Sequence, residues 1–265
     1  MTVAALNSRS LIAVGGPDWR TFLQGLLTQD VDSLVPGEAR FAALLTPQGR
    51  LLYDLFIAGQ DDGALLDVAA EHRDGLLQRL TLYRLRAKVD LAAGDLPVFA
   101  EFPGGTAGVP DPRLPQLGRR IYGPAAADAD EAAYEAHRLA LGVPGSADWG
   151  SERTYPIEAN FDLLNGIDFK KGCFVGQETT SRMKRRGQIK NRMLPIVFEG
   201  PPPAPGTEIL TGDLRAGEVL SGMDGRAMAL LRLDRALGAE LTVDGRPARV
   251  DIPSWFPQSA GDNAV

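Results

Sequence analysis

The single cysteine of the chain, Cys173, is the residue whose surroundings most directly suggest chemistry. It stands between Gly172 and Phe174, and a second glycine, Gly176, follows three positions later. Glycines on both sides allow the backbone to turn sharply or to let a ligand approach closely. Lys171 precedes Gly172, and cationic side chains near a cysteine favour the thiolate, the form that attacks electrophiles and binds metal ions. The pattern therefore predicts a reactive or metal-binding thiol.

Positive side chains continue from Arg182 to Arg192, in a chain whose net charge is −6. If a helix begins at Gln177 and Glu178, the positive end of its dipole also favours the thiolate. Two other interpretations stay open, because a lone cysteine is often a small buried apolar residue and a basic run is often only a solvated face. His72 and His137 do not stand at metal-ligand spacing with the cysteine, so we expect no structural zinc site, which needs about four ligands.

The cysteine count, the apolar runs and the net charge indicate where the protein is located and which partners it has. One cysteine cannot form an internal disulfide, which suits an intracellular chain. The N-terminal stretch from Met1 to Ser10 lacks the apolar core of a signal peptide, and no apolar run approaches the roughly 20 residues that span a bilayer. We therefore expect a cytoplasmic protein with no membrane partner. The acidic net charge argues against a general nucleic-acid binder.

Apolar spacing predicts the elements of the N-terminal part. Apolar residues at helical spacing from Trp19 to Leu27 predict a first helix. Two apolar runs, Arg40–Thr46 and Leu51–Ala58, flank a Pro-Gln-Gly-Arg turn and predict a β-hairpin. Strands mixed with helices, without a strict βαβ rhythm, indicate the α+β class. The further candidates are strands at Ala64–Ala69, Leu96–Phe102 and Gly118–Tyr122 and helices at Leu76–Ala87 and Asp130–Leu141.

The proline-rich segment Pro201–Gly206 is the clearest candidate for a domain boundary, because such segments are stiff and unpaired. Short apolar runs follow it, separated by turn sequences such as Asp224-Gly225 and Asp244-Gly245. Asp-Gly between apolar runs is a strong hairpin signal. The C-terminal part is therefore expected to form a small antiparallel barrel or sandwich, and the polar end after Phe256 is expected to fray.

The run Lys171–Glu178 reads KGCFVGQE and resembles the K-G-C-[FY]-x-G-Q-E signature of the YgfZ family. That family is similar to the T protein (aminomethyltransferase) of the glycine cleavage system. Phe22–Val31 resembles the family's F-L-Q-G-x-x-T-x-D-V block, and Thr46–Arg50 resembles its P-x-G-[RK] turn. Tyr83–Val89 is similar to its Y-x-[LF]-R-x-K-V segment, and Gly217–Arg232 is similar to its barrel pattern. The resemblance covers nearly the whole chain.

This resemblance implies an α+β fold with a folate-binding body and a barrel. Two interleaved α+β domains would form the body around a central channel over residues 1–195, an antiparallel β-barrel would follow over 196–257, and 258–265 would be a tail. The family binds tetrahydrofolate, so tetrahydrofolate or another folate is the expected cofactor. Cys173 carries over as the functional cysteine, with Lys171 favouring its thiolate. The motif neighbours would support the loop, the glycines by turning and the others by hydrogen bonds or helix capping: Gly172, Gly176, Gln177 and Glu178.

Four further residues are expected to contact the folate. Thr28 and Asp30 match the N-terminal block, and Asp30 would accept hydrogen bonds from the pterin, although both could simply form the turn that ends the first helix. Tyr134 aligns with an aromatic position near the folate, where it would stack on the ligand or pack in the core. Arg182 would pair with the anionic glutamate tail. Ala140 stands where the T-protein pattern R-x-E-x-G has its glutamate, which predicts weaker folate binding or a contact from another carboxylate.

The resemblance implies a folate-binding factor for assembly or repair of iron–sulfur clusters, with client or assembly proteins as partners. Such clusters normally take four ligands, so Cys173 would act in transfer or together with a partner or a small thiol. A maturation factor is favoured over a turnover enzyme. The alternatives are an aminomethyltransferase-like one-carbon transferase, a tRNA-modification factor with tRNA as its partner, and a structural homologue without a ligand.

Overall fold

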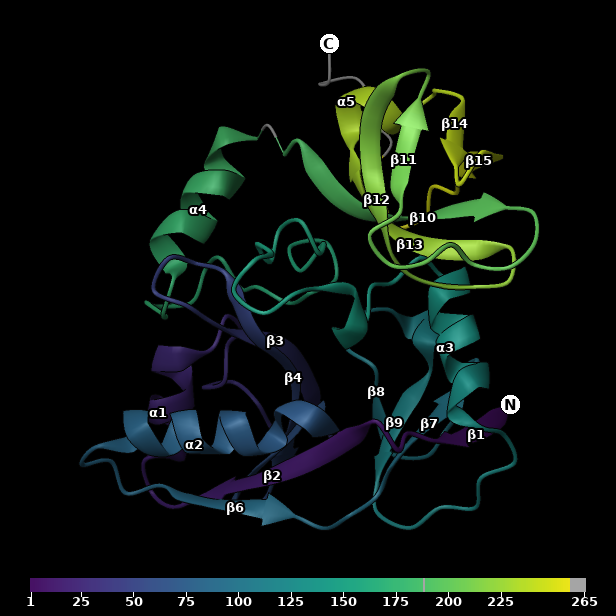
Figure 1. Cartoon of the computed structure of the whole chain (residues 1–265). Coiled ribbons are helices and arrows are strands. Elements are labelled where there is room, and N and C mark those ends of the chain that lie inside the picture. The colour runs from purple at the N-terminus through teal and green to yellow at the C-terminus, as the bar shows by residue number, and fades with distance from the viewer. Residues whose placement is uncertain (188, 258–265) are drawn as a thin grey trace.

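The computed structural model describes residues 1–187 and 189–257, and the expected tail, 258–265, lies outside the described residues. Figure 1 shows a lower body of sheets and helices with a barrel above it. The expected α+β class and the antiparallel C-terminal barrel are both confirmed. In the described part of the chain, no helix is long and apolar enough to cross a membrane.

The larger sheet of the body grows from the predicted hairpin. Its two strands pair in antiparallel register around the Pro-Gln-Gly-Arg turn, where Gly49 takes a positive φ of 81° that a glycine adopts without strain. Three more strands extend the sheet, all antiparallel. In spatial order the strands are β3 (Ala39–Leu45), β4 (Leu51–Gln60), β5 (Gly63–Ala69), β2 (Arg9–Gly15) and β6 (Asp90–Gly94).

Two helices, α1 (Trp19–Leu26) and α2 (Arg73–Arg84), pack on this sheet with the apolar faces that their spacing predicts. Trp19 and Leu23 of α1 are buried, as are Leu76 and Leu80 of α2. These side chains share one apolar core with the sheet. The position of α1 matters for the site, because its C-terminal end leads directly into the segment around Thr28 and Asp30.

A smaller sheet is interleaved with the first along the chain. The chain supplies its edge strand β1, leaves to build the whole larger sheet, and returns at β7, so the two expected α+β parts are intertwined. Helix α3 (Glu131–Ala140) covers this sheet, and Asp130 caps it by accepting a hydrogen bond from the Ala133 amide at 3.0 Å. The strands in order are β1 (Thr2–Ala5), β7 (Val98–Phe102), β9 (Arg119–Tyr122) and β8 (Val109–Pro110).

The segment from 141 to 176 runs mostly without regular structure between the body and the barrel. Its apolar residues Ile157 and Phe161 are fully buried. They pack between barrel residues such as Met193 and the face of the larger sheet opposite α1 and α2. The segment ends in helix α4 (Gln177–Arg186), which stands at the edge of the molecule between body and barrel (Figure 1). Short 3₁₀ turns lie at Ala70–His72, Pro115–Leu117 and Ser146–Asp148.

The barrel is closed because its first strand, β10, pairs with β13 on one side and with β15 on the other. Asp224-Gly225 and Asp244-Gly245 form the turns of two of its hairpins, as predicted. The boundary expected at 195/196 falls inside β10, and Pro201–Gly206 connects β10 to β11 within the barrel. The elements are β10 (Asn191–Phe198), β11 (Glu208–Thr211), β12 (Leu214–Met223), β13 (Arg226–Arg232), α5 (Leu233–Ala236), β14 (Leu241–Val243) and β15 (Arg246–Val250).

Candidate functional site: the Cys173 loop and an arginine-lined cavity

Cys173 is exposed on the loop that leads into α4, so the interpretation as a buried core residue is wrong. The helix that the thiol argument needs does begin at Gln177. Phe174 is buried next to the thiol and packs in the core between body and barrel. The loop therefore exposes the Cys173 sulfur to solvent, while the buried ring of Phe174 anchors the backbone to the core.

Two glycines lock this loop to the tip of the β3–β4 hairpin. Gly176 has a φ of 80°, and a Cβ there would lie 2.6 Å from the carbonyl oxygen of Thr46 and 2.9 Å from Cα of Gly49. A Cβ on Gly49 would in turn lie 2.9 Å from Cβ of Thr179. Backbone approach this close is possible only without side chains. Two motifs that lie far apart in the sequence are thus packed together.

Lys171 anchors the other end of the loop to α1. Its ammonium Nζ donates to the carbonyl oxygens of Gln24, Leu27 and Gln29 at 2.8, 2.6 and 2.8 Å, and the residue is only 9% exposed. The last carbonyls of a helix lack partners within the helix, and a cation at this end is also favoured by the helix dipole. Lys171, which we expected to act on the thiol, therefore serves as a C-terminal cap of α1.

The charges of nearby aspartates also act on this ammonium. Burial lowers the pKa of Lys171 to about 8, and Asp30, Asp168 and Asp32 act against that shift. The Asp168 carboxylate also accepts hydrogen bonds from the amides of Lys170 and Lys171, at 2.7 and 3.3 Å. The loop before Cys173 is thus held by its own backbone as well as by the Lys171 side chain.

Asp30 is used within the protein. One carboxylate oxygen accepts from Nε2 of Gln24 at 2.8 Å, and the other accepts from the amide and hydroxyl of Ser33. Burial raises the pKa of Asp30, but the hydrogen bonds from Ser33 and Gln24 outweigh it and hold the pKa below its ordinary value. This arrangement matches the alternative in which Asp30 builds the turn after the first helix.

Thr28 is completely buried and joins three segments. Its hydroxyl donates to the carbonyl of Gly166 at 2.6 Å and accepts from the amide of Ala43 at 2.8 Å. Its own carbonyl accepts from the Asp168 amide at 2.9 Å. Thr28 therefore ties the end of α1 to β3 and to the start of the Cys173 loop.

The other expected residues of the loop make fewer contacts. Gly172 is exposed, and a Cβ there would meet no atom within 4 Å. Among the described residues, the side chains of Gln177 and Glu178 form no hydrogen bond that fixes the loop, although Glu178 lies in the first turn of α4, where an acid is favoured. Arg182 is exposed on α4.

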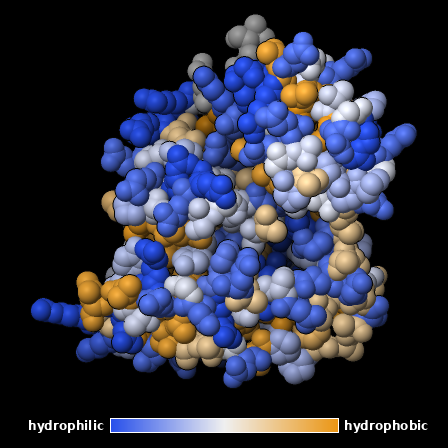
Figure 2. Space-filling view, viewed as in Figure 1, coloured by the Kyte–Doolittle hydropathy of each residue, from blue (hydrophilic) through white to orange (hydrophobic). Residues whose placement is uncertain are grey.

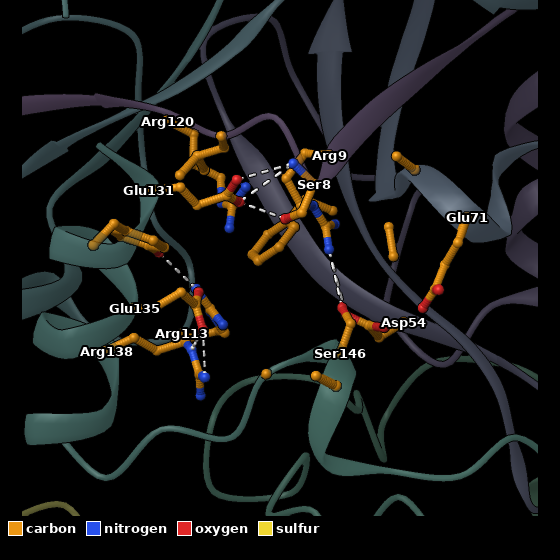
Figure 3. A pocket seen from close by; sticks show the side chains of 17 residues that line it. Ser8, Arg9, Asp54, Glu71, Arg113, Arg120, Glu131, Glu135, Arg138 and Ser146 are labelled. Atoms are coloured by element: carbon orange, nitrogen blue, oxygen red, sulfur yellow. Dashed lines mark hydrogen bonds and ion pairs between the residues drawn. The ribbon is translucent and has the colours of Figure 1, made fainter. Parts of the chain in front are cut away.

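A separate cavity of about 380 Å³ lies between the larger sheet and α3. Figure 3 shows charged side chains from both elements pointing toward one another across it. None of residues 170–186 lines it, so the Cys173 loop and the cavity are two different places. Its cationic lining residues are Arg9, Arg113, Arg120 and Arg138, and its acidic ones are Asp54, Glu71, Glu131 and Glu135.

The arginines of this cavity are fixed by buried ion pairs. Arg120 lies 2.5 Å from Asp67 and places its guanidinium 3.6 Å from the ring centre of Phe56, a cation–π contact. Arg113 binds Asp111 through two nitrogens, at 3.0 and 2.8 Å. Burial raises the pKa of Asp111, but the charge of Arg113 outweighs it and holds the pKa below the ordinary value. These buried ion pairs hold the Arg113 and Arg120 guanidinium groups in place at the cavity wall.

Tyr134 is the one expected ligand contact that lies in this cavity. It is 3% exposed, its hydroxyl accepts from Arg113 Nη2 at 3.0 Å, and its ring meets Phe102 edge-on at 5.3 Å. It thus lies apart from Thr28 and Asp30, which belong to the Cys173 side. Ala140 is exposed at the last residue of α3, whereas Glu135 of the same helix points to the cavity.

Asp54 is a functional candidate that the sequence reading missed. Its Oδ2 accepts from the Ser146 hydroxyl at 2.8 Å and lies 3.9 Å from Arg9. Its Oδ1 is buried and has no hydrogen-bond partner within residues 1–187 and 189–257. A buried acceptor without a donor is costly, and the Asp54 side chain that carries it lines the cavity. The sequence does contain a signal for it, because Asp54 is the one acidic residue inside the apolar run Leu51–Ala58.

Known proteins share both the sequence and the fold of this chain. Residues 190–258 match the family described as "CAF17, C-terminal beta-barrel domain". The chain is 35% identical to the "Iron-sulfur cluster assembly factor IBA57 homolog, mitochondrial" of Pyricularia oryzae, over 92% of this chain and 74% of that protein. It is 31% identical to the "Iron-sulfur cluster assembly factor IBA57, mitochondrial" of Homo sapiens, over 95% and 84%.

The aminomethyltransferase T of the glycine cleavage system from Bartonella henselae superposes with a TM-score of 0.77 at 19% identity, over 97% of this chain and 86% of that one. The T-protein-like fold expected from the sequence is therefore confirmed. The expectation of a cytoplasmic protein is corrected, because the two relatives named above are described as mitochondrial proteins.

Proposed function

The chain belongs to the family of IBA57 iron–sulfur cluster assembly factors, to which the YgfZ family is related, and on that premise we propose that it assembles or repairs clusters in client proteins through Cys173. The observation that supports this role is the exposed thiol on a loop braced at both ends. Lys171 fixes one end to α1 and Gly176 fixes the other to the β3–β4 hairpin. Such bracing positions a reactive group without covering it.

Cys173 acts together with ligands from elsewhere. An iron–sulfur cluster normally takes four ligands, and among the described residues no group of three or more His, Cys, Asp and Glu side chains could hold a metal ion. The remaining ligands would come from an assembly or client protein, or from a small thiol. The chain then contributes one sulfur and a fixed surface, and the cluster is its cargo.

The test replaces Cys173 with serine in cells that otherwise lack the protein. We expect the activity and iron content of iron–sulfur enzymes to fall as far as in the deletion. The purified Cys173→Ser variant should unfold at the same denaturant concentration as the wild type, since the exposed sulfur supports no core packing. Full enzyme activity in cells that carry the variant would reject this role.

A folate is the ligand that we propose for the cavity. The pterin ring of tetrahydrofolate presents neighbouring N–H donors, which suit the carboxylate of Asp54 in the cavity lining. The aromatic ring of Tyr134 and the cavity arginines suit its ring system and its anionic tail. Asp54 would then supply the carboxylate for the pterin that the T-protein pattern R-x-E-x-G places where this chain has Ala140. The Cys173 proposal does not depend on this ligand.

Calorimetric titration with tetrahydrofolate tests the cavity. Asp54→Asn should weaken binding by about 10- to 100-fold, because a hydrogen bond to a charged group contributes about 1.5–3 kcal/mol. Asp30→Asn is the matched control, since Asp30 lies outside the cavity and should leave the affinity within about twofold. Equal losses in both variants, or no binding by the wild type, would reject the folate site.

The alternatives are a one-carbon transferase and a tRNA-modification factor. The likeness to the T protein is a likeness of fold, and a folate in the cavity would be compatible with a maturation factor as well as with a transferase. The cysteine loop is the feature that sets the maturation role above both alternatives.

A further inference from the structure

Positive charge is concentrated around α4, directly after the exposed thiol. Residues 170–192 hold eight Lys and Arg and one Glu, so the other residues of the chain carry a net charge of −13. Figure 2 shows strongly hydrophilic side chains gathered over α4, at the upper left of the view. The segment 170–192 is thus strongly basic in an otherwise acidic chain, and it includes the proposed site.

The cations of α4 fall on the side of the helix that faces away from the core. Thr180 is buried and Met183 packs against the core between body and barrel. Arg182, Arg185 and Arg186 are exposed and lie three and four positions apart, so they share one face. We call these three residues the basic face of α4.

In the part of the chain that the structure describes, the three arginines of the basic face form no ion pair, and the one acid on α4 is Glu178, four positions before Arg182. Lys184 pairs with Asp162 at 3.5 Å, but none of the three arginines has a carboxylate within 4 Å. Cations near a helix C-terminus interact well with the dipole, yet like charges three and four positions apart repel one another. A solvated face alone does not require this arrangement, whereas an anionic partner would relieve it.

We infer that the basic face of α4 docks an acidic surface on the protein with which this chain exchanges an iron–sulfur cluster. The inference rests on the proposed function, since it names the chemistry of that partner. Carboxylates repeated on one helix face have the spacing that Arg182, Arg185 and Arg186 present. A helix of ten residues is about 15 Å long, so a partner seated on it lies beside the Cys173 loop.

A compact acidic protein surface fits the charge distribution better than a nucleic acid. A phosphate backbone carries its charge far beyond the length of one short helix, and it would meet the −13 of the remaining chain. A local acidic patch meets only the basic region. The same separation of charge orients an approaching acidic partner toward the thiol.

Fluorescence anisotropy with a labelled helical peptide of about 16 residues, carrying Glu along one face, tests this inference. A peptide with Gln at the same positions is the ligand control. We expect the Glu peptide alone to bind, with an affinity that falls as salt rises. The variant with Arg182→Glu, Arg185→Glu and Arg186→Glu should bind at least about tenfold more weakly.

A second charge-reversal variant controls for net charge. Arg86→Glu, Lys88→Glu and Arg249→Glu change the same total charge at exposed positions elsewhere, and binding should stay within about twofold of the wild type. The milder set of Gln substitutions in the basic face guards against misfolding and should give an intermediate loss. Equal losses in the two Glu variants would overturn the inference.

Two further outcomes separate this inference from its alternatives. If a short single-stranded RNA binds the wild type more tightly than the Glu peptide, and the basic-face variant loses it, the partner is a nucleic acid and the inference is wrong. Cys173→Ser should bind the peptide normally. If that variant also supports full cluster assembly in cells, the proposed function fails while the peptide result still decides the chemistry of the basic face.

Discussion

Replacing Lys171 by methionine tests whether its ammonium, rather than its proximity to the thiol, explains its place in the motif. Methionine keeps the length of the buried stem but removes the three N–H groups that bind Gln24, Leu27 and Gln29. The carbonyls at the end of α1 would then have no donor. The link between the Cys173 loop and α1 would be reduced to backbone contacts near Thr28.

The size of the effect follows from these three hydrogen bonds. A hydrogen bond to a charged group contributes about 1.5–3 kcal/mol, and the cost of burying the ammonium offsets part of their sum. Leu27, whose carbonyl accepts the shortest of the three, is 1% exposed, so water does not readily replace the donor there. We therefore expect Lys171→Met to lower the free energy of unfolding by about 2–4 kcal/mol.

Urea unfolding measures this change, and Lys170→Met is its matched control. Lys170 is the neighbouring lysine, and its side chain is exposed, so its variant should stay within about 0.5 kcal/mol of the wild type. Amide hydrogen exchange over residues 168–174 should speed up only in Lys171→Met. If the two variants were equally stable, with equal exchange in the loop, the anchoring role would be refuted.

Three other substitutions probe the supports of the site. Gly176→Ala should destabilise the protein by about 2–4 kcal/mol through its left-handed φ and its clash with Thr46, whereas Gly172→Ala should be neutral; thermal unfolding compares them. Thr28→Val should cost about 1–3 kcal/mol in urea, because two buried groups lose their partner. The pKa of Asp111 is held below its ordinary value, so its carboxylate stabilises the native state above about pH 4 and that gain is lost as pH falls through the lowered pKa. Asp111→Asn should therefore be less stable at pH 7, and a series of unfolding curves should show its deficit shrinking below about pH 4.

Local patterns predicted the elements whose signals lie within a few residues. The β3–β4 hairpin and the turn at Asp244-Gly245 are where the sequence places them. Asp244 and Gly245 both have positive φ, 52° and 71°, the geometry of the two-residue turn that Asp-Gly favours. The apolar faces of α1 and α2 likewise follow from spacing alone.

Elements that depend on distant partners were not predictable in this way. β1 pairs with β7, with Thr2 opposite Phe102, and no local pattern reports a partner so far along the chain. The sequence analysis does not predict β10, because the proline-rich segment directly after it is interpreted as a boundary between two domains. A proline inside that strand, Pro195, also weakened its signal.

The site shows the same division. The motif Lys171–Glu178 identified the loop, but the acceptors of Lys171 are carbonyls 142 to 147 positions earlier in the chain. Carbonyls carry no sequence signature, so an anchoring lysine cannot be told from a thiol-activating one by residue type. Asp54 and its cavity likewise become visible only when the larger sheet, α3 and the segment around Ser146 are placed together.

Strand β4 sets a distance between the two sites. Its hairpin tip at Gly49 touches Gly176 of the Cys173 loop, and Asp54 of the same strand lines the cavity. At about 3.3 Å per residue in extended chain, the five steps from Gly49 to Asp54 span at most about 17 Å. Under the functions proposed above, a one-carbon group in the cavity and a cluster at the thiol would therefore have no common reaction centre. The β3–β4 hairpin is a direct covalent connection between the two places, since its tip contacts the Cys173 loop and its strand β4 carries Asp54.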